Sequence, residues 1–199
     1  MTVIEDIRNS LRATAAVYGA MADDLAESTA RAADLLIAAL RAGRTIYVCG
    51  NGGSASQAQH IAGELVGRFR IDRPALACVA LSTDTSILTA VANDYDFDAV
   101  FERQVDALVR QGDVLWALTT SGSSANVIKA AACARKRGAR VLGMTGRGGG
   151  KLRELCDVAL CVPADSSPVI QEGHLALLHI LCGLVEQAMF GPAAGQGKG

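Results

Sequence analysis

The chain has 199 residues with 19 basic and 20 acidic side chains, which give a formal net charge of −1. With no basic stripe along the sequence, this balance excludes an electrostatic surface for nucleic acid. No apolar run reaches the ~18–20 residues of a membrane span, and the acidic residues near the first methionine do not fit a secretion signal. Half of the residues are hydrophobic and only 4% are aromatic, which favours an aliphatic core. We therefore expect one cytoplasmic domain over residues 1–199, with no membrane or nucleic-acid partner.

Six cysteines are spread over the chain, and no two of them have the C-x-x-C spacing. Most of them lie in apolar stretches. Buried, reduced thiols are typical of cytosolic proteins, and a disulfide framework is not expected at this chain length. The cysteines therefore agree with a cytoplasmic location and predict no thiol chemistry.

The first part of the chain, residues 2–42, shows helical spacing of its apolar side chains. A second helical run covers residues 26–42 and stops at Gly43, a residue typical of helix C-termini. Two helices before the first strand are more than a minimal α/β unit needs. We expect residues 1–43 to pack against another subunit of an oligomer.

From residue 45 onward, short apolar runs alternate with helical stretches. The expected strands cover residues 45–49, 76–81, 114–118, 140–144 and 158–162. Helices are expected between them, including residues 125–137, and the last runs from near Pro168 to about residue 190. The glycine-rich tail, residues 191–199, is expected to fray. This alternation predicts an α/β fold: a three-layer, doubly wound, five-stranded parallel sheet with extra N-terminal helices.

Two loops stand out at the edge where a doubly wound sheet binds ligands, beyond the carboxyl ends of its strands. Residues 49–54 (Cys-Gly-Asn-Gly-Gly-Ser) place glycines and their backbone amides before a helix. Residues 119–124 (Thr-Thr-Ser-Gly-Ser-Ser) offer hydroxyls that can donate to phosphate oxygens. Each loop alone is equally well an ordinary turn with a serine cap, but two on one edge favour an anion site. Neither fits a dinucleotide or P-loop motif, and glycine-rich residues 146–151 are expected to be a flexible loop.

The histidines fall in two of the expected helices. His60 and Glu64 lie one turn apart on one face, a spacing that suits adjacent metal ligands, a base held by a neighbour, or a surface hydrogen bond. Gln171 and His179 lie roughly 80° apart around the last helix, so they share one side. These four side chains could close a metal site, although glutamine is an uncommon zinc ligand. His174 lies well round the helix from His179, and we expect it either to be structural or to support one of the ligands.

Taken together, these motifs resemble the sedoheptulose 7-phosphate isomerases, or phosphoheptose isomerases, of the sugar isomerase (SIS) domain superfamily. The resemblance extends from the N-terminal helices to about residue 190, and the full ordered set is far more specific than any one motif. The motifs are the Gly50–Ser54 turn, Gln59-His60 with Glu64, Asn93-Asp94, the Thr119–Ser124 cluster, and Ile170-Gln171-Glu172 with His179. Two features depart from the family pattern and bear on substrate preference. One is Ser123, where the family often has asparagine, and the other is the segment of residues 166–169.

The resemblance implies a flavodoxin-like SIS fold and an isomerase that converts sedoheptulose 7-phosphate to D-glycero-D-manno-heptose 7-phosphate. It also implies a homotetramer with sites at subunit interfaces and one zinc ion per subunit. The implied zinc ligands are His60, Glu64, Gln171 and His179. The implied phosphate-binding residues are Ser54, Thr119, Thr120, Ser121 and Ser124. The implied sugar-binding residues are Asn51, Gly52, Gly53, Asn93, Asp94 and Gln171.

Aldose–ketose isomerisation moves a proton between C1 and C2 through an enediol, for which a carboxylate base and an imidazole acid are suited. We expect Glu64 to be the base and His179 the acid, with zinc polarising the carbonyl. Two alternatives share the fold: a non-catalytic, protein-binding tetramer such as a replication-initiation regulator, and a regulatory sugar-phosphate-binding domain. The presence of both Glu64 and His179 favours the enzyme.

Overall fold

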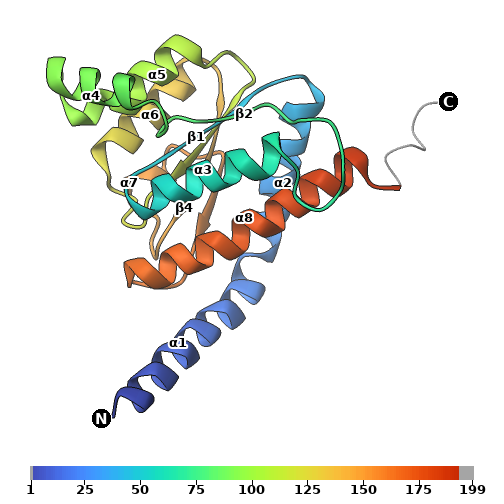
Figure 1. Cartoon of the computed structure of the whole chain (residues 1–199), viewed down its shortest axis with the longest axis vertical. Coiled ribbons are helices and arrows are strands. Elements are labelled where there is room, and N and C mark those ends of the chain that lie inside the picture. Colours follow the sequence, from blue (N-terminus) through green and yellow to red (C-terminus); the bar gives the residue numbers. More distant parts are fainter. Residues whose placement is uncertain (1, 193–199) are drawn as a thin grey trace.

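The fold is seen in a computed structural model that describes residues 2–192 (Figure 1). Five parallel strands form one sheet in the order β2-β1-β3-β4-β5. The strands are β1 (Ile46–Gly50), β2 (Cys78–Ala80), β3 (Val114–Leu118), β4 (Arg140–Thr145) and β5 (Val158–Cys161). Every residue of β1 and β3 is buried, as expected for central strands covered on both faces. The predicted parallel sheet is confirmed, and its strand order is the flavodoxin-like one.

The edge strand β2 is shorter than the predicted 76–81. It pairs only with β1, from Ile46 opposite Cys78 to Val48 opposite Ala80. Leu76 and Leu81 lie outside the ladder but are both buried. Their apolar character therefore reflects burial at the two ends of an edge strand rather than additional pairing.

Helices cover both faces of the sheet. They are α1 (Val3–Asp24), α2 (Ala26–Arg41), α3 (Gly53–Val66), α4 (Thr85–Asp94), α5 (Val100–Leu108), α6 (Ala125–Lys136), α7 (Gly150–Arg153) and α8 (Ser167–Phe190), with a 3-10 turn, η1 (Phe97–Ala99). Alternate strand residues point to opposite faces, so Ile46 and Val48 join a core with α2, α3 and α8. Tyr47 and Cys49 join a second core with α5 and α6. The three predicted layers are confirmed.

The N-terminal part of the first helix, α1, extends away from the sheet and its covering helices (Figure 1). A capping box formed by Thr2 and Glu5 begins it. Its apolar residues Val3, Ile4 and Leu11 are each more than 60% exposed, whereas α2 buries its apolar face in the core. The N-terminal pair therefore divides into a core helix and a projecting one, and packing of residues 1–43 on another subunit stays a prediction. The tail predicted to fray lies, from residue 193 onward, outside the described residues.

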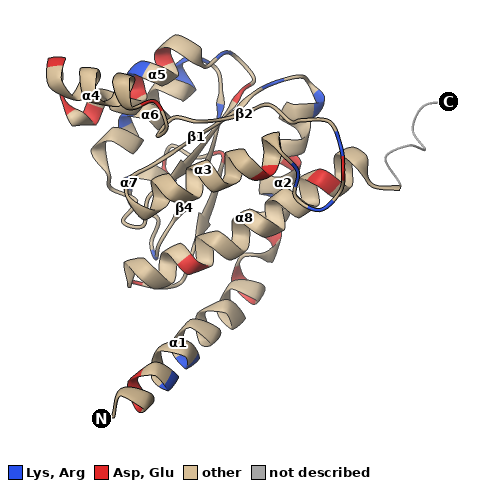
Figure 2. Ribbon diagram, in the orientation of Figure 1, with Lys and Arg blue, Asp and Glu red and all other residues tan. Residues whose placement is uncertain are grey.

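The last helix, α8, is long and apolar enough to cross a membrane by length and composition alone. In this structure it is a core helix, because Leu178, Leu181 and Val185 are fully buried. It packs against α1, α2 and α3, and acidic residues interrupt its apolar surface (Figure 2). Its apolar character is thus explained by the aliphatic core.

His174 is a buried histidine at the centre of this helix, with no exposed surface. Its Nε2 donates to the Thr145 carbonyl oxygen at 3.1 Å, and its Nδ1 has no partner. Burial lowers the pKa of His174 to about 4, against the opposing effect of the bond to Thr145. The predicted structural role agrees with this placement.

The neutral state of His174 predicts a loss of stability in mild acid. Between pH 6.5 and about 4 the unfolded chain binds a proton that the folded chain does not, so the free energy of unfolding falls as pH drops. From pH 7 to pH 5 this amounts to about 2 kcal/mol. The free energy of unfolding can be measured in urea at pH 7 and at pH 5, at fixed protein concentration. Its decrease between these two pH values should be smaller in His174→Gln than in the parent protein by about this amount. Equal drops in both proteins would contradict the expectation.

Candidate active site

The carboxyl edge of the sheet is where α3 and α6 begin, directly after β1 and β3. Gly52 precedes α3 with a φ of 54°, a conformation that favours glycine. Neither Gly52 before α3 nor Ser124 before α6 forms a side-chain cap. No serine hydroxyl caps either helix, which argues against the ordinary-turn interpretation. The amides of Ser54 and Ala55 donate to the Asn51 and Gly52 carbonyls, and the Val127 amide donates to Asn126 Oδ1. An anion at these helix starts would therefore contact the earliest amides, those of Gly53 and Ala125.

The two loops are joined by a reciprocal pair of amide hydrogen bonds. Asn51 Nδ2 donates to Asn126 Oδ1 at 2.9 Å, and Asn126 Nδ2 donates to Asn51 Oδ1 at 2.8 Å. Asn126 is buried, and its Oδ1 also accepts from the Val127 backbone. Asn51 therefore positions the first loop against the start of α6. Sequence reasoning missed Asn126, although a single amide among the apolar residues of that helix is a signal that could have indicated it.

The hydroxyl cluster of the second loop is confirmed as a spatial group. Thr119 Oγ1 lies 2.9 Å from Ser124 Oγ and 3.3 Å from Ser121 Oγ, and Ser121 Oγ also accepts from the Ser123 amide. Thr120 Oγ1 lies 3.2 Å from the hydroxyl of Ser167, the first residue of α8. Ser167 was also missed, and it brings the start of a third helix to this edge.

Gln171, on the first turns of α8, lies against the start of α3. A Cβ added to Gly53 would be 2.5 Å from Gln171 Oε1, so any larger residue would displace this amide from its position. The Gln171 backbone carbonyl accepts from Gln57 Nε2 at 2.6 Å, while the buried Gln57 Oε1 has no partner. These contacts tie α8 to α3 beside the glycine turn, near the buried Ser54.

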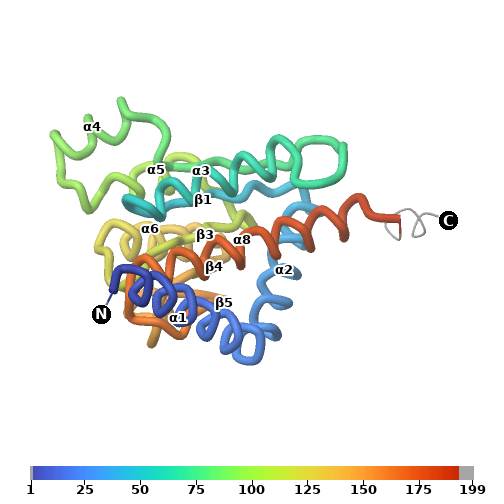
Figure 3. The backbone as a smooth tube through the Cα atoms, turned by 60° about the horizontal axis from the view of Figure 1, so that its bottom comes forward, coloured from blue at the N-terminus to red at the C-terminus, as the bar shows by residue number. Residues whose placement is uncertain are grey.

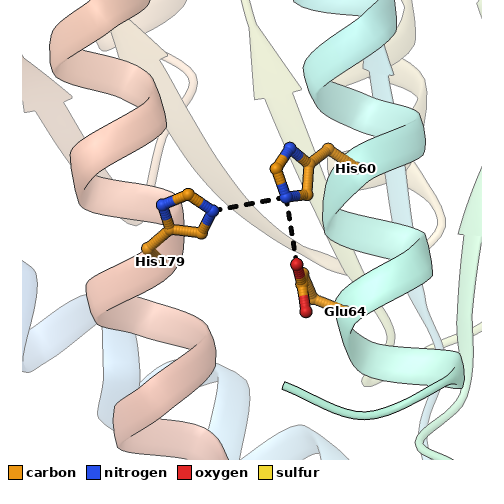
Figure 4. Close-up of side chains that lie close together, drawn as sticks. All are labelled: His60, Glu64 and His179. Carbon is orange, nitrogen blue, oxygen red and sulfur yellow. Dashed lines mark hydrogen bonds and ion pairs between the residues drawn. The ribbon is translucent and has the colours of Figure 1, made fainter. Parts of the chain in front are cut away.

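Further along the same pair of helices, His60, Glu64 and His179 point toward one another (Figure 4). His60 Nε2 lies 3.0 Å from Glu64 Oε1 and 3.3 Å from His179 Nε2. One ligand atom from each residue lies within 4.8 Å of the others. His60 Nε2 carries at most one hydrogen, so it cannot donate to both neighbours. A divalent cation would accept all three lone pairs, and two imidazoles with a carboxylate are a donor set that suits catalytic zinc.

Gln171 was proposed from the sequence as the fourth ligand. In the structure its side chain lies away from the cluster of His60, Glu64 and His179. Gln171 and His179 share a side of α8 but are separated by about 12 Å along its axis, at ~1.5 Å per residue. The Gln171 amide is beside Gly53, seven residues before His60 on α3. Within one chain the cluster therefore has three ligands, and Gln171 as a zinc ligand stays a prediction.

The Asn93-Asp94 pair lies at the end of α4, on exposed side chains. Asn93 Nδ2 donates to Asp94 Oδ1 at 2.9 Å. Helix α4 packs against η1 and α5, on the other side of the sheet from α8. No hydrogen bond among the described residues joins this pair to the loops or to the histidine cluster, so its role in sugar binding stays a prediction.

Comparison with known proteins decides the family. A model of the SIS domain matches residues 11–146. The phosphoheptose isomerase of Pelobacter propionicus is 50% identical over 188 residues, which are 94% of this chain and 100% of that protein. The chain belongs to the phosphoheptose isomerase family. The solved phosphoheptose isomerase from Neisseria gonorrhoeae superposes with a TM-score of 0.89 at 43% identity, over 94% of this chain and 100% of that one. The structure of the Francisella tularensis phosphoheptose isomerase, over the same shares of the two chains, gives 0.91 at 35% identity.

Within the phosphoheptose isomerase fold, the site therefore has two parts along the seam between α3 and α8. The glycine turn, the hydroxyl loop and the Gln171 amide lie at its sheet-edge end. The histidine cluster lies further along, with His60 six residues, or about 9 Å of helix, beyond Ser54. The SIS fold and the phosphoheptose isomerase family expected from the motifs are confirmed.

The contact between Gly53 and Gln171 makes Gly53→Ala a test of the sheet-edge part. The new Cβ displaces the Gln171 amide while keeping the backbone amide of residue 53. We expect KM for a sugar phosphate to rise about tenfold, which corresponds to ~1.4 kcal/mol, with thermal stability preserved by the better helix propensity of alanine. Gly63→Ala, in the same helix but with nothing within 4 Å of its Cβ, is the matched control. Equal KM values in the two variants would show that the Gln171 position is unimportant.

Proposed function

We propose that this chain interconverts sedoheptulose 7-phosphate and D-glycero-D-manno-heptose 7-phosphate through an enediol intermediate. The family supports the reaction, since the Pelobacter propionicus phosphoheptose isomerase is 50% identical over 94% of the chain. The observation that carries the proposal is the meeting of Glu64 and His179 in one cluster, at hydrogen-bonding distances from His60. A sugar-phosphate-binding domain without catalysis needs the hydroxyl loop but not this carboxylate and imidazole.

The substrate phosphate is proposed to bind at the sheet edge. Ser54, Thr119, Thr120, Ser121 and Ser124 supply hydroxyls there, and the uncapped first turns of α3 and α6 supply backbone amides. A helix N-terminus favours an anion without a lysine or arginine. Asn51, Gly52, Gly53 and Gln171 are placed to contact the sugar that extends from the phosphate toward the cluster. Asn93 and Asp94 are proposed to contact sugar across a subunit interface, because their helix lies away from the loops in one chain.

Proton transfer is proposed to involve Glu64 and His179. Glu64 takes the proton from C1 while His179 donates a proton to the C2 carbonyl oxygen, which gives the enediol. Glu64 then returns its proton to C2 as the proton of the C1 hydroxyl passes to His179, which gives the aldose. His60 lies between them, with its Nε2 3.0 Å from Glu64 Oε1 and 3.3 Å from His179 Nε2. Zinc, held by His60, Glu64 and His179, would supply polarisation of the carbonyl when bound. Glu64 would then be ligand and base in turn, which requires a change of its coordination.

A homotetramer and a cytoplasmic location complete the proposal. The exposed apolar side chains of α1 are the surface that a second subunit would cover. The six cysteines are free, and Cys49, Cys78, Cys133 and Cys182 are buried, as suits a reducing compartment. Assembly would bring the exposed Asn93-Asp94 pair of one chain within reach of a neighbouring site.

Replacing the proposed base tests the reaction directly. Glu64→Gln keeps the size of the side chain but removes its basicity, so turnover of sedoheptulose 7-phosphate should fall by roughly 10²–10⁴-fold. Inhibition by inorganic phosphate should be unchanged, because the hydroxyl loop is untouched. Glu154→Gln, on an exposed carboxylate away from the site, is the control and should behave like the parent protein. Near-normal turnover by Glu64→Gln would overturn the assignment.

Zinc binding is tested separately from turnover. Chelator-treated protein should take up one zinc ion per subunit in equilibrium dialysis. His60→Ala should weaken this binding by at least about 100-fold, because even residues outside the ligand set contribute 10–100-fold. His174→Gln, which changes the one histidine outside the cluster, should bind zinc like the parent. Equal zinc uptake by His60→Ala and the parent would exclude this cluster as the metal site.

A further inference from the structure

Glu186, near the end of α8, is a buried carboxylate outside the site described above. It is 2% exposed, and its two oxygens accept four hydrogen bonds. The donors are the backbone amides of Phe69 (3.0 Å), Arg70 (2.7 Å) and Ile71 (2.9 Å) and the side-chain Nε of Arg73 (3.2 Å). Burial alone would raise the pKa of Glu186, but these donors outweigh it and the pKa lies below its usual value. The carboxylate is therefore charged and organises residues 67–73, here named the Phe69 loop.

The Phe69 loop reaches the histidine cluster through its aromatic ring. The Phe69 ring stacks on the His179 imidazole, with centroids 5.7 Å apart and planes 18° from parallel. A Cβ added to Gly183 would lie 3.3 Å from the Phe69 ring, so this glycine makes room for the stack. His179, Gly183 and Glu186 follow a four- and three-residue spacing and so share one face of α8. Arg70 lies over the same ring, 4.8 Å from its centroid.

A second connection runs from Glu186 to the helix that carries Glu64. Arg73, paired with Glu186, donates from Nη2 to the Glu64 carbonyl and from Nη1 to the Leu65 carbonyl, both at 2.7 Å. The last carbonyls of a helix have no amide donor within the helix, and a cation is favourable at this end. The Arg73 guanidinium therefore suits the C-terminus of α3 as a hydrogen-bond donor. The side chains of this ion pair are 1% and 3% exposed. Figure 2 shows the basic loop after α3 beside an acidic turn of α8.

We propose that Glu186 is a positioning residue for the isomerase site, acting on His179 through the stacked ring of Phe69 and on the Glu64 end of α3 through Arg73. The proposal rests on the proposed function in that His179 is the proton donor there. The ring fixes the plane of the imidazole, so that Nε2 faces His60 rather than solvent. Without the carboxylate, three amides and a guanidinium lose their common acceptor, and the ring loses its support.

The positioning is tested first without any turnover. The chain has three histidines, so protein labelled with ¹³C at the histidine rings gives few signals. His179 ring signals, assigned by substitution, should shift in Phe69→Leu, because the aromatic ring current is removed. Glu186→Gln should shift them in the same direction, because the loop detaches. His179 signals that remain unchanged in Glu186→Gln would overturn the proposal.

Kinetics then separates positioning from general stability. Phe69→Leu and Glu186→Gln should each lower kcat roughly three- to tenfold, the scale of an aromatic contact, with KM nearly unchanged. The double variant should lose no more kcat than Glu186→Gln alone, since the Phe69 contact is one of the two routes by which Glu186 acts. Two structural controls should lower stability but not kcat. Phe101→Leu removes a buried ring on the opposite sheet face, and Asp113→Asn removes a buried carboxylate that accepts from the Thr45 and Arg110 amides.

The outcomes distinguish this proposal from the proposed function. If the parent protein does not isomerise sedoheptulose 7-phosphate but the His179 signals shift as described, the positioning stands and the substrate assignment fails. If the parent is active and both variants keep full kcat, the function stands and the positioning fails. A loss of kcat in Asp113→Asn as large as in Glu186→Gln would also count against positioning, because it would show that lost stability alone lowers turnover.

Discussion

The parallel packing of α3 and α8 on one face of the sheet is the arrangement on which the whole site depends (Figures 1 and 3). At one end of this seam, Gln171 fits against Gly53 and Gln57 donates to the Gln171 backbone. In the middle, His179 meets His60. At the far end, Arg73 and Glu186 join the C-terminus of α3 to α8. Gln171 and the cluster of His60, Glu64 and His179 are therefore held between two helices that the aliphatic core already fixes.

The sheet edge adds a different physical element, a place for negative charge made without basic side chains. Phosphate groups are commonly bound by helix N-termini, where unpaired amides and the helix dipole act together. Here α3 and α6 begin without side-chain caps, and the Ser124 hydroxyl lies 2.9 Å from that of Thr119 instead of capping α6. The reciprocal amide pair of Asn51 and Asn126 keeps the two helix starts at a fixed separation. In the proposed function, specificity for the substrate phosphate would come from the shape of this edge rather than from net charge.

Much of this could be predicted from the sequence, and the rest could not for geometric reasons. The apolar runs predicted all five strands, since buried parallel strands have no other composition available. The i, i+4 spacing predicted that His60 and Glu64 share a helix face, which is a local property. The angle of roughly 80° around α8 places Gln171 and His179 on one side, but their eight-residue spacing also separates them by about 12 Å along the axis, so a shared metal site stays a prediction. Phe69 and Glu186 escaped notice because their contact joins residues 117 positions apart, and no local pattern encodes it.

The buried pair of Arg73 and Glu186 is better explained by geometry than by stability. Removing two charges from water is costly, and replacement of such pairs by apolar residues is often neutral or stabilising. A stabilising role alone would therefore be served as well by leucine or methionine at these positions. An ion pair differs from an apolar contact in that it fixes direction: the carboxylate must face three amides and a guanidinium at once. That directional requirement sets where the Phe69 ring lies, and the ring in turn sets the plane of the His179 imidazole.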